Sequence, residues 1–152
     1  MTPGGFEQPL PPVLAENAAT SYQYTEGRYV AAAFSDAASQ VWPAGAFATT
    51  ATDMARFMIA HLQEGRVPEA SRAGGGGRIL DAETADEMHR RQFQHHPALL
   101  RGRALGFNDR YHNGRRVIWH TGRVLEFTSQ LVLMPEEGVG FFATCNSGTG
   151  DE

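Results

Sequence analysis

The chain has 152 residues and a net charge of −4, and 41% of its residues are hydrophobic. This length and apolar content suit one globular domain with a core and argue against a disordered chain. The acidic balance offers no basic surface that could follow a phosphate backbone, so nucleic acid is not expected as a partner.

All 13 basic residues are arginine, so a reaction that needs a lysine amine cannot be completed by this sequence alone. The sequence does not open with a basic segment followed by an apolar stretch, and no apolar run is long enough to cross a bilayer. We therefore expect neither a signal peptide nor a transmembrane segment in this chain, and its localisation stays open.

Residues 1–40 form a loop-rich lead-in, because four prolines among the first twelve residues fix the backbone and remove hydrogen-bond donors. Polar residues separate the tyrosines that follow, Tyr22, Tyr24 and Tyr29. This spacing fits either a short strand or a loop anchored by aromatic side chains, and both alternatives stay open.

The clearest predicted helix follows Thr50, which can cap it, and Asp53 lies near the positive end of its dipole. Apolar residues recur there at helical spacing: Met54, Phe57, Met58 and Leu62. Such a stripe is typical of core packing. Gly65 is placed to end this helix.

The glycine run Gly74–Gly77 lacks the strand before it and the Gly-Lys-Ser/Thr after it that a phosphate loop needs, so it predicts a flexible connector. A second helix is expected over Glu83–Gln92 with Asp81 as its cap. Because its apolar content is thin, we expect this helix, and His89 on it, to lie on the surface.

Strand patterns dominate from Ala104 onward, and Asn113-Gly114 is a strong hairpin signal. The expected strands are Leu105–Tyr111, Arg116–His120, Phe127–Met134 and Val139–Cys145. The sequence therefore predicts an α+β fold in which helices pack on an antiparallel β-meander of about four strands, in a single domain over residues 1–152. Cys145, the only cysteine, ends an apolar strand, so a buried structural thiol is expected.

Metal binding is not predicted. His89, His95, His96 and His112 lack the His-x-x-x-His pair or the clustered carboxylates that a zinc site needs. A histidine-based metal site remains only as a weaker alternative, and no cofactor is expected.

His120 stands out because it ends a strand and Thr121-Gly122 follows it. These residues offer a proton-active side chain, a hydroxyl donor and a bare backbone that a ligand can approach, and N–H groups beyond such a glycine can face an oxyanion. On spacing alone, a polar strand end before a turn explains the same residues and is the simpler interpretation. The serines have no Ser-x-x-Lys or Gly-x-Ser-x-Gly setting that would activate them.

Several segments together resemble class C β-lactamase-like and penicillin-binding-protein-type serine hydrolases. The first resembles the motif "P-A-G-G-L-x-S-T-A-x-D-M-A-R-F", and the fourth resembles the "G-H-T-G" form of the Lys-Thr-Gly motif. The matching segments, in chain order, are Pro43–Phe57, Ile79–Thr84, Leu105–Phe107, Trp119–Gly122, Phe127–Pro135 and Val139–Asn146. Their order places the resemblance in residues 41–152, as the C-terminal part of that fold.

The resemblance implies acyl transfer on amide or ester substrates such as β-lactams, D-amino-acid peptides or esters. In the family a Ser-x-x-Lys serine attacks, a Tyr-x-Asn tyrosine assists, and the Lys/His-Thr-Gly strand binds substrate and lines the oxyanion hole. Only His120, Thr121, Gly122 and Arg123 carry over, as the substrate-binding and oxyanion edge. The nucleophile and the base have no counterpart in the matched segments, so we expect no activity from this chain alone.

Two departures from the family pattern bear on this edge. Arg123 replaces a glycine, which either crowds the site or attracts an anionic substrate, and Leu125-Glu126 replaces Pro-Gly, which disfavours a tight turn. The family's N-terminal strands and final helix are not among the matched segments, which leaves a sheet edge and a face uncovered. The alternative function is therefore a non-catalytic interaction module, which complements an N-terminal piece or forms a homo-oligomer or strand-swapped dimer.

Overall fold

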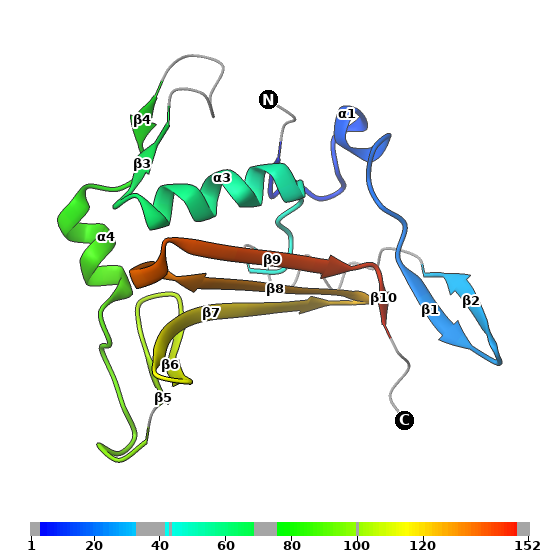
Figure 1. Ribbon diagram of the computed structural model, residues 1–152. Helices are drawn as coiled ribbons and strands as arrows, with labels where there is room; N and C mark the ends of the chain where they lie inside the picture. The colour runs from blue at the N-terminus through cyan, green and yellow to red at the C-terminus, as the bar shows by residue number, and fades with distance from the viewer. Residues whose placement is uncertain (1–3, 33–41, 43, 69–75, 100, 149–152) are drawn as a thin grey trace. The chain divides into compact units, whose positions relative to one another are not determined.

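The protein is described by a computed structural model covering residues 4–32, 42, 44–68, 76–99 and 101–148 (Figure 1). It divides into two compact units. Unit 1 comprises Ala51–His120 and Gln130–Phe142, and unit 2 comprises Thr2–Thr50, Thr121–Ser129 and Ala143–Glu152. The expectation of one domain over residues 1–152 stays a prediction. No helix in the described residues is long and apolar enough to span a bilayer.

The N-terminal part of the described chain contains one short helix and a small sheet. These elements are α1 (Pro12–Ala15), β1 (Tyr22–Thr25), β2 (Arg28–Ala31) and, from the C-terminal end, β10 (Ser147–Gly148). The β1 strand pairs antiparallel with β2 and parallel with β10. Tyr24 lies opposite Tyr29 across the hairpin, with ring centroids 5.1 Å apart. The tyrosine segment is therefore a strand pair and not a loop.

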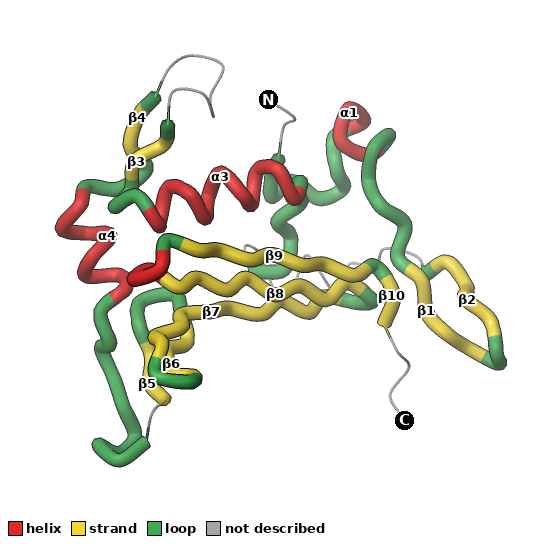
Figure 2. The backbone as a smooth tube through the Cα atoms, in the orientation of Figure 1, coloured by secondary structure: helices red, strands yellow, loops and turns green. Residues whose placement is uncertain are grey.

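The remaining helices and strands begin with α3 and continue to β9 (Figure 2). They are α3 (Ala51–Leu62), β3 (Arg66–Val67), β4 (Gly77–Arg78), α4 (Ala82–His89), β5 (Arg101–Arg103), β6 (Asn108–His112), β7 (Arg115–Val124), β8 (Phe127–Met134), the 3-10 turn η2 (Pro135–Glu137) and β9 (Val139–Cys145). Strands β5 to β9 form one sheet in sequence order, which makes the α+β fold with a β-meander a confirmed prediction. Residues 74 and 75 of the glycine run lie outside the described residues.

The core of unit 1 forms where α3 packs on the sheet. Its buried members are Met58, Ala104, Phe107, Ile118, Leu131 and Leu133. Ile118 on β7 and Leu133 on β8 are both fully buried. A Cβ built on Gly140 of β9 would lie 3.1 Å from the Met58 sulfur, so the bare backbone there admits the helix side chain. The predicted Met/Phe stripe therefore packs in the core, as expected for an amphipathic helix.

The strand boundaries differ from the sequence prediction in two places. Strand β6 begins at Asn108 and not at Leu105, because Gly106 has φ +76° and the Ala104 amide donates to the Phe107 carbonyl in a turn. Strand β7 continues beyond His120 to Val124, and only Leu125 and Glu126 separate it from β8. The tight turn disfavoured by the missing glycine therefore forms, with Leu125 held at φ +53°.

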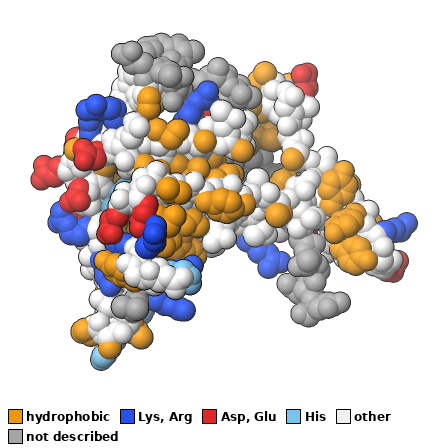
Figure 3. All heavy atoms as spheres, in the orientation of Figure 1, with side chains coloured by type: hydrophobic (Ala, Val, Ile, Leu, Met, Phe, Trp, Pro, Cys, Tyr) orange, Lys and Arg blue, Asp and Glu red, His pale blue; other side chains and the backbone are white. Residues whose placement is uncertain are grey.

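Two predicted positions relative to solvent were wrong. Helix α4 is not a surface helix throughout, because Ala85 and His89 are buried and the Leu105 amide donates to the Met88 carbonyl. Cys145 is exposed, since β9 is the outermost strand of the sheet and Phe141 on it is 57% exposed. Hydrophobic side chains are accordingly visible on the molecular surface (Figure 3).

We expect Gly65→Ala to lower the stability of the chain by roughly 2 kcal/mol, measured by urea unfolding. Gly65 has φ +84°, and a Cβ there would lie 2.2 Å from the Leu80 carbonyl oxygen, so the substitution adds a backbone clash to the strain of a left-handed residue. Gly114→Ala is the matched control, because Gly114 has φ +76° with nothing within 4 Å of its Cβ position. It should cost only about 1 kcal/mol, and equal losses for the two variants would contradict the clash.

Candidate functional site

The candidate edge lies on β7, where the strand leaves the core. Val117 and Ile118 are buried, whereas the four residues His120–Arg123 are all exposed. The ladder with β6 ends at the pair Asn108–Trp119. In the described part of the chain the register with β6 stops at Trp119, so His120–Arg123 lie past the end of that ladder.

Asn108 fixes the point where the ladder stops. Its side-chain amide donates to the Trp119 carbonyl oxygen at 3.3 Å, and its carbonyl oxygen accepts from the Arg103 guanidinium. The Arg110 guanidinium lies 5.7 Å from the centroid of the Trp119 ring. These contacts hold Trp119, the residue directly before His120, where the β6 ladder ends.

The other side of the open segment is held by the hairpin to β8. A Cβ built on Gly122 would lie 2.7 Å from the Ser129 hydroxyl oxygen, so that hydroxyl occupies the space beside the bare glycine. Side chains alternate along a strand, so His120 and Gly122 face one side of the sheet and Thr121 and Arg123 face the other. Sequence reasoning did not single out Ser129, whose place beside Gly122 depends on the two-residue turn.

The residue types of this segment can serve the chemistry of ligand binding. An exposed strand edge can pair with the backbone of an extended ligand, and its N–H groups can stabilise an oxyanion. The imidazole of His120 and the hydroxyl of Thr121 add side-chain donors and acceptors. The structure brings together all four residues predicted from the sequence, because they are consecutive on one strand.

A Tyr-x-Asn sequence does occur in the chain, at Tyr111-His112-Asn113. It belongs to the β6–β7 hairpin, where Asn113 at φ +51° and Gly114 at φ +76° form the turn. The Tyr111 ring lies 5.6 Å from the Arg91 guanidinium carbon. This tyrosine pairs in register with Arg116, at the end of β7 away from His120, and so does not join the candidate edge.

A second polar cluster lies in unit 1 and was missed in the sequence. His61 Nδ1 of α3 and His89 Nε2 of α4 are 3.0 Å apart, and both residues are buried. His61 could have been noticed, since it falls four residues after Phe57 and three after Met58, on the apolar stripe. His89 had been assigned to the surface because α4 has few apolar residues.

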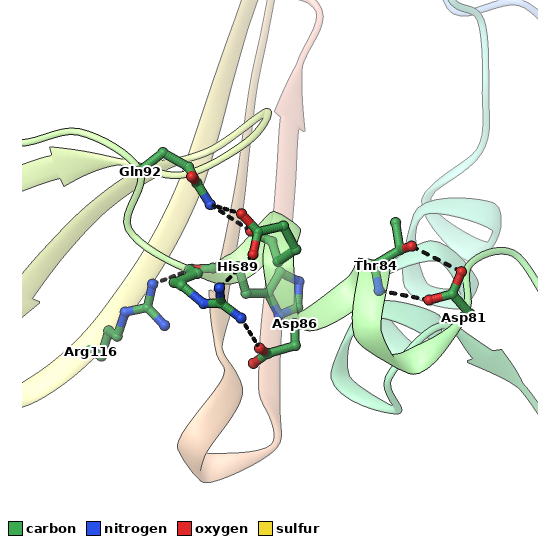
Figure 4. Close-up of polar contacts among 8 residues, drawn as sticks. Asp81, Thr84, Asp86, His89, Gln92 and Arg116 are labelled. Atoms are coloured by element: carbon green, nitrogen blue, oxygen red, sulfur yellow. Dashed lines mark hydrogen bonds and ion pairs between the residues drawn. The ribbon is translucent and has the colours of Figure 1, made fainter.

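Through the His89 carbonyl, the imidazole pair is linked to ion pairs around the buried Asp109 side chain. The Arg116 guanidinium points at and donates to the carbonyl oxygen of His89 (Figure 4). Arg116 Nε also pairs with Asp109 Oδ1 at 3.2 Å, and Arg91 Nε pairs with Asp109 Oδ2 at 2.5 Å. The Asp109 side chain is fully buried, so two guanidinium groups neutralise a carboxylate that solvent cannot reach.

Metal-ligand geometry is not found in the described residues, where no three His, Cys, Asp or Glu side chains are grouped around a common point. The exposed histidines His95, His96 and His112 lie in the loop after α4 and at the end of β6. They do not approach one another as a site.

Comparison with known proteins gives the family. The family model described as Beta-lactamase matches residues 6–152. No curated protein matches the chain. Among solved structures, the chain is similar to the octameric penicillin-binding protein homologue from Pyrococcus abyssi, with a TM-score of 0.66 and 18% identity. That similarity covers 95% of this chain and 30% of the other, so the chain spans less than a third of that protein and the likeness concerns the fold. Since the family model extends over nearly its whole length, the chain belongs to the Beta-lactamase family, whose members are serine hydrolase-type domains.

Proposed function

We propose that this chain supplies the substrate-binding and oxyanion edge of a serine acyl-transfer site, and that it does not hydrolyse substrates alone. The observation that carries the proposal is the exposed segment His120–Arg123, which begins where the β6 ladder stops at Trp119. Membership of the Beta-lactamase family supports the reaction class.

The substrate class follows from what a strand edge can bind. An extended D-amino-acid peptide, a β-lactam or an ester presents a carbonyl whose oxygen becomes negative when a nucleophile attacks it. In this proposal a backbone N–H of the exposed segment stabilises that charge, while Thr121 and His120 bind polar groups of the substrate. Arg123 favours substrates that carry a negative charge nearby.

The proposed lack of activity alone rests on the missing partners of a nucleophile. All 13 basic residues are arginine, and an arginine guanidinium does not give up its proton at ordinary pH. No serine is followed by lysine three residues later, so no serine here has the base that the family uses. The edge then functions only with a nucleophile supplied from outside these 152 residues.

Hydrolysis assays on the purified chain test this proposal. With nitrocefin and with p-nitrophenyl acetate, we expect rates indistinguishable from those of a mock purification. His112→Gln changes an exposed residue outside His120–Arg123, so it is the matched control and should give the same background rate. Turnover that co-purifies with the chain and falls in a serine variant would contradict the proposal.

The exposed edge strand β9 favours a second candidate function, an interaction module that associates with another chain. Strand β9 lies at the end of the five-strand order, has no charged residue, and exposes Val139 and Phe141. Such an edge is a template for strand addition. Size-exclusion chromatography with light scattering should give a dimer or larger species, which Phe141→Lys should shift to monomer. A folded monomer at every concentration would reject self-association.

A further inference from the structure

The buried histidine pair has no part in the proposed function and joins two helices that are far apart in the sequence. His61 is in the last turn of α3, and His89 is the last residue of α4. The two ring nitrogens are 3.0 Å apart, a hydrogen-bond distance that needs one nitrogen to donate and the other to accept. That requirement is met when both imidazoles are neutral.

Two phenylalanine rings pack against the pair, which itself has little contact with water. The Phe57 ring lies 4.4 Å from the His61 ring centroid, and the Phe107 ring lies within 6 Å of both imidazoles. His61 is only 4% exposed and His89 only 9%. A positive charge on either ring would therefore lose most of its hydration.

The charged groups around the pair do not compensate for this loss. Arg116 from β7 approaches His89 and repels an added proton, and the Asp109 carboxylate on β6 is already shared between Arg116 and Arg91. Asp86, one turn earlier on α4, favours the protonated form, but it is exposed and pairs with Arg90. The C-terminal ends of both helices also favour a cation, by an amount smaller than the cost of burial.

We propose that the His61–His89 pair is an acid-sensitive latch, which holds the last turn of α4 on the last turn of α3 at neutral pH and releases it when the imidazoles become protonated. A first proton places a positive charge beside the Phe57 and Phe107 rings, where little water reaches it. A second proton makes both nitrogens donors, so the hydrogen bond is lost and two cations face each other.

The direction of the pH dependence follows from the folded and unfolded states. Burial lowers the pKa of His61 to about 4, and His89 lowers it in the same direction. Burial, followed by Arg116, also lowers the pKa of His89. The unfolded chain therefore takes up protons before the folded chain does, so the latch is fully stable above a pH of about 6.5 and weakens as the pH falls towards 4.

Amide hydrogen exchange of the 152-residue chain tests the latch. After correction for intrinsic exchange rates, we expect α4 amides to exchange at least about tenfold faster at pH 4.5 than at pH 7.5, with a smaller change in β8. In His61→Gln the glutamine still offers His89 a hydrogen-bonding partner but does not take up a proton. The increase in α4 amide exchange at low pH should therefore be much smaller in this variant. The matched control His112→Gln removes an exposed imidazole and should behave as the unaltered chain.

Proton NMR of the histidine rings gives a second readout that needs no variant to fold. Two imidazoles should titrate in the acid range, and His61→Gln should remove one of them while the pKa of His89 stays lowered by burial and Arg116. The latch is overturned if all six histidines titrate together, or if His61→Gln loses α4 protection in acid to the same extent as the unaltered chain.

Discussion

Replacing Asp109 by alanine is expected to destabilise the chain by about 3–5 kcal/mol. The Asp109 side chain is fully buried and pairs with both Arg91 and Arg116, whose side chains are 24% and 18% exposed. Removing the carboxylate leaves two largely buried guanidinium groups facing each other without a counter-charge. Arg116 would also lose the anchor that directs it to the His89 carbonyl, so the C-terminal end of α4 should loosen. Urea unfolding followed by circular dichroism measures the loss.

Asp86→Ala is the matched control for this prediction. Asp86 also pairs with an arginine, Arg90, but both side chains are more than half exposed, so water replaces the lost partner. We expect no measurable change in stability for Asp86→Ala. If the two aspartate variants unfolded at the same urea concentration, the Asp109 network would not be the buried support inferred from its geometry.

Leu133→Ala is expected to cost about 2–5 kcal/mol, because it removes a fully buried side chain from the core between α3 and the sheet. Leu133 lies in β8 and approaches Gly140 of β9, where the Met58 side chain also packs, so the resulting cavity cannot be filled easily. Phe141→Ala on β9 is the control, since Phe141 is 57% exposed and its loss should change stability little. An equal effect of both substitutions would show that β9 is covered in solution.

The sheet was largely predictable because its last two strands carry their own hydrophobic pattern. Strands β8 and β9 have the boundaries predicted from hydrophobic patterning, and the Asn113-Gly114 hairpin lies where its turn residues indicated. Strand β5, Arg101–Arg103, was missed because arginine and glycine give it no strand pattern. It forms through pairing with β6 and through the bridge from Phe93 to Arg103, which are contacts made by other parts of the chain.

The residues of the candidate site were predictable from the sequence, but the end of the β6 ladder beside them was not. His120, Thr121 and Gly122 were identified from the order of residue types. The β6 ladder stops beside Trp119 because β6 begins only at Asn108, a boundary set by the turn at Gly106 and Phe107. The His61–His89 pair joins positions 28 residues apart on two helices, and no local pattern encodes their separation. Cys145 was assigned to the interior from its apolar neighbours, but strand order decides its exposure.

Covalent trapping reports most directly on whether this chain contains a nucleophile. The purified 152-residue chain would be incubated with benzylpenicillin and, separately, with a fluorophosphonate, and its intact mass measured. We expect an unchanged mass in both cases, because no serine has a lysine partner and the segment His120–Arg123 is proposed only to bind substrate. A mass increase of one penicilloyl or phosphonyl group, mapped to a serine of this chain, would contradict the assignment of the chain as a binding edge without its own nucleophile.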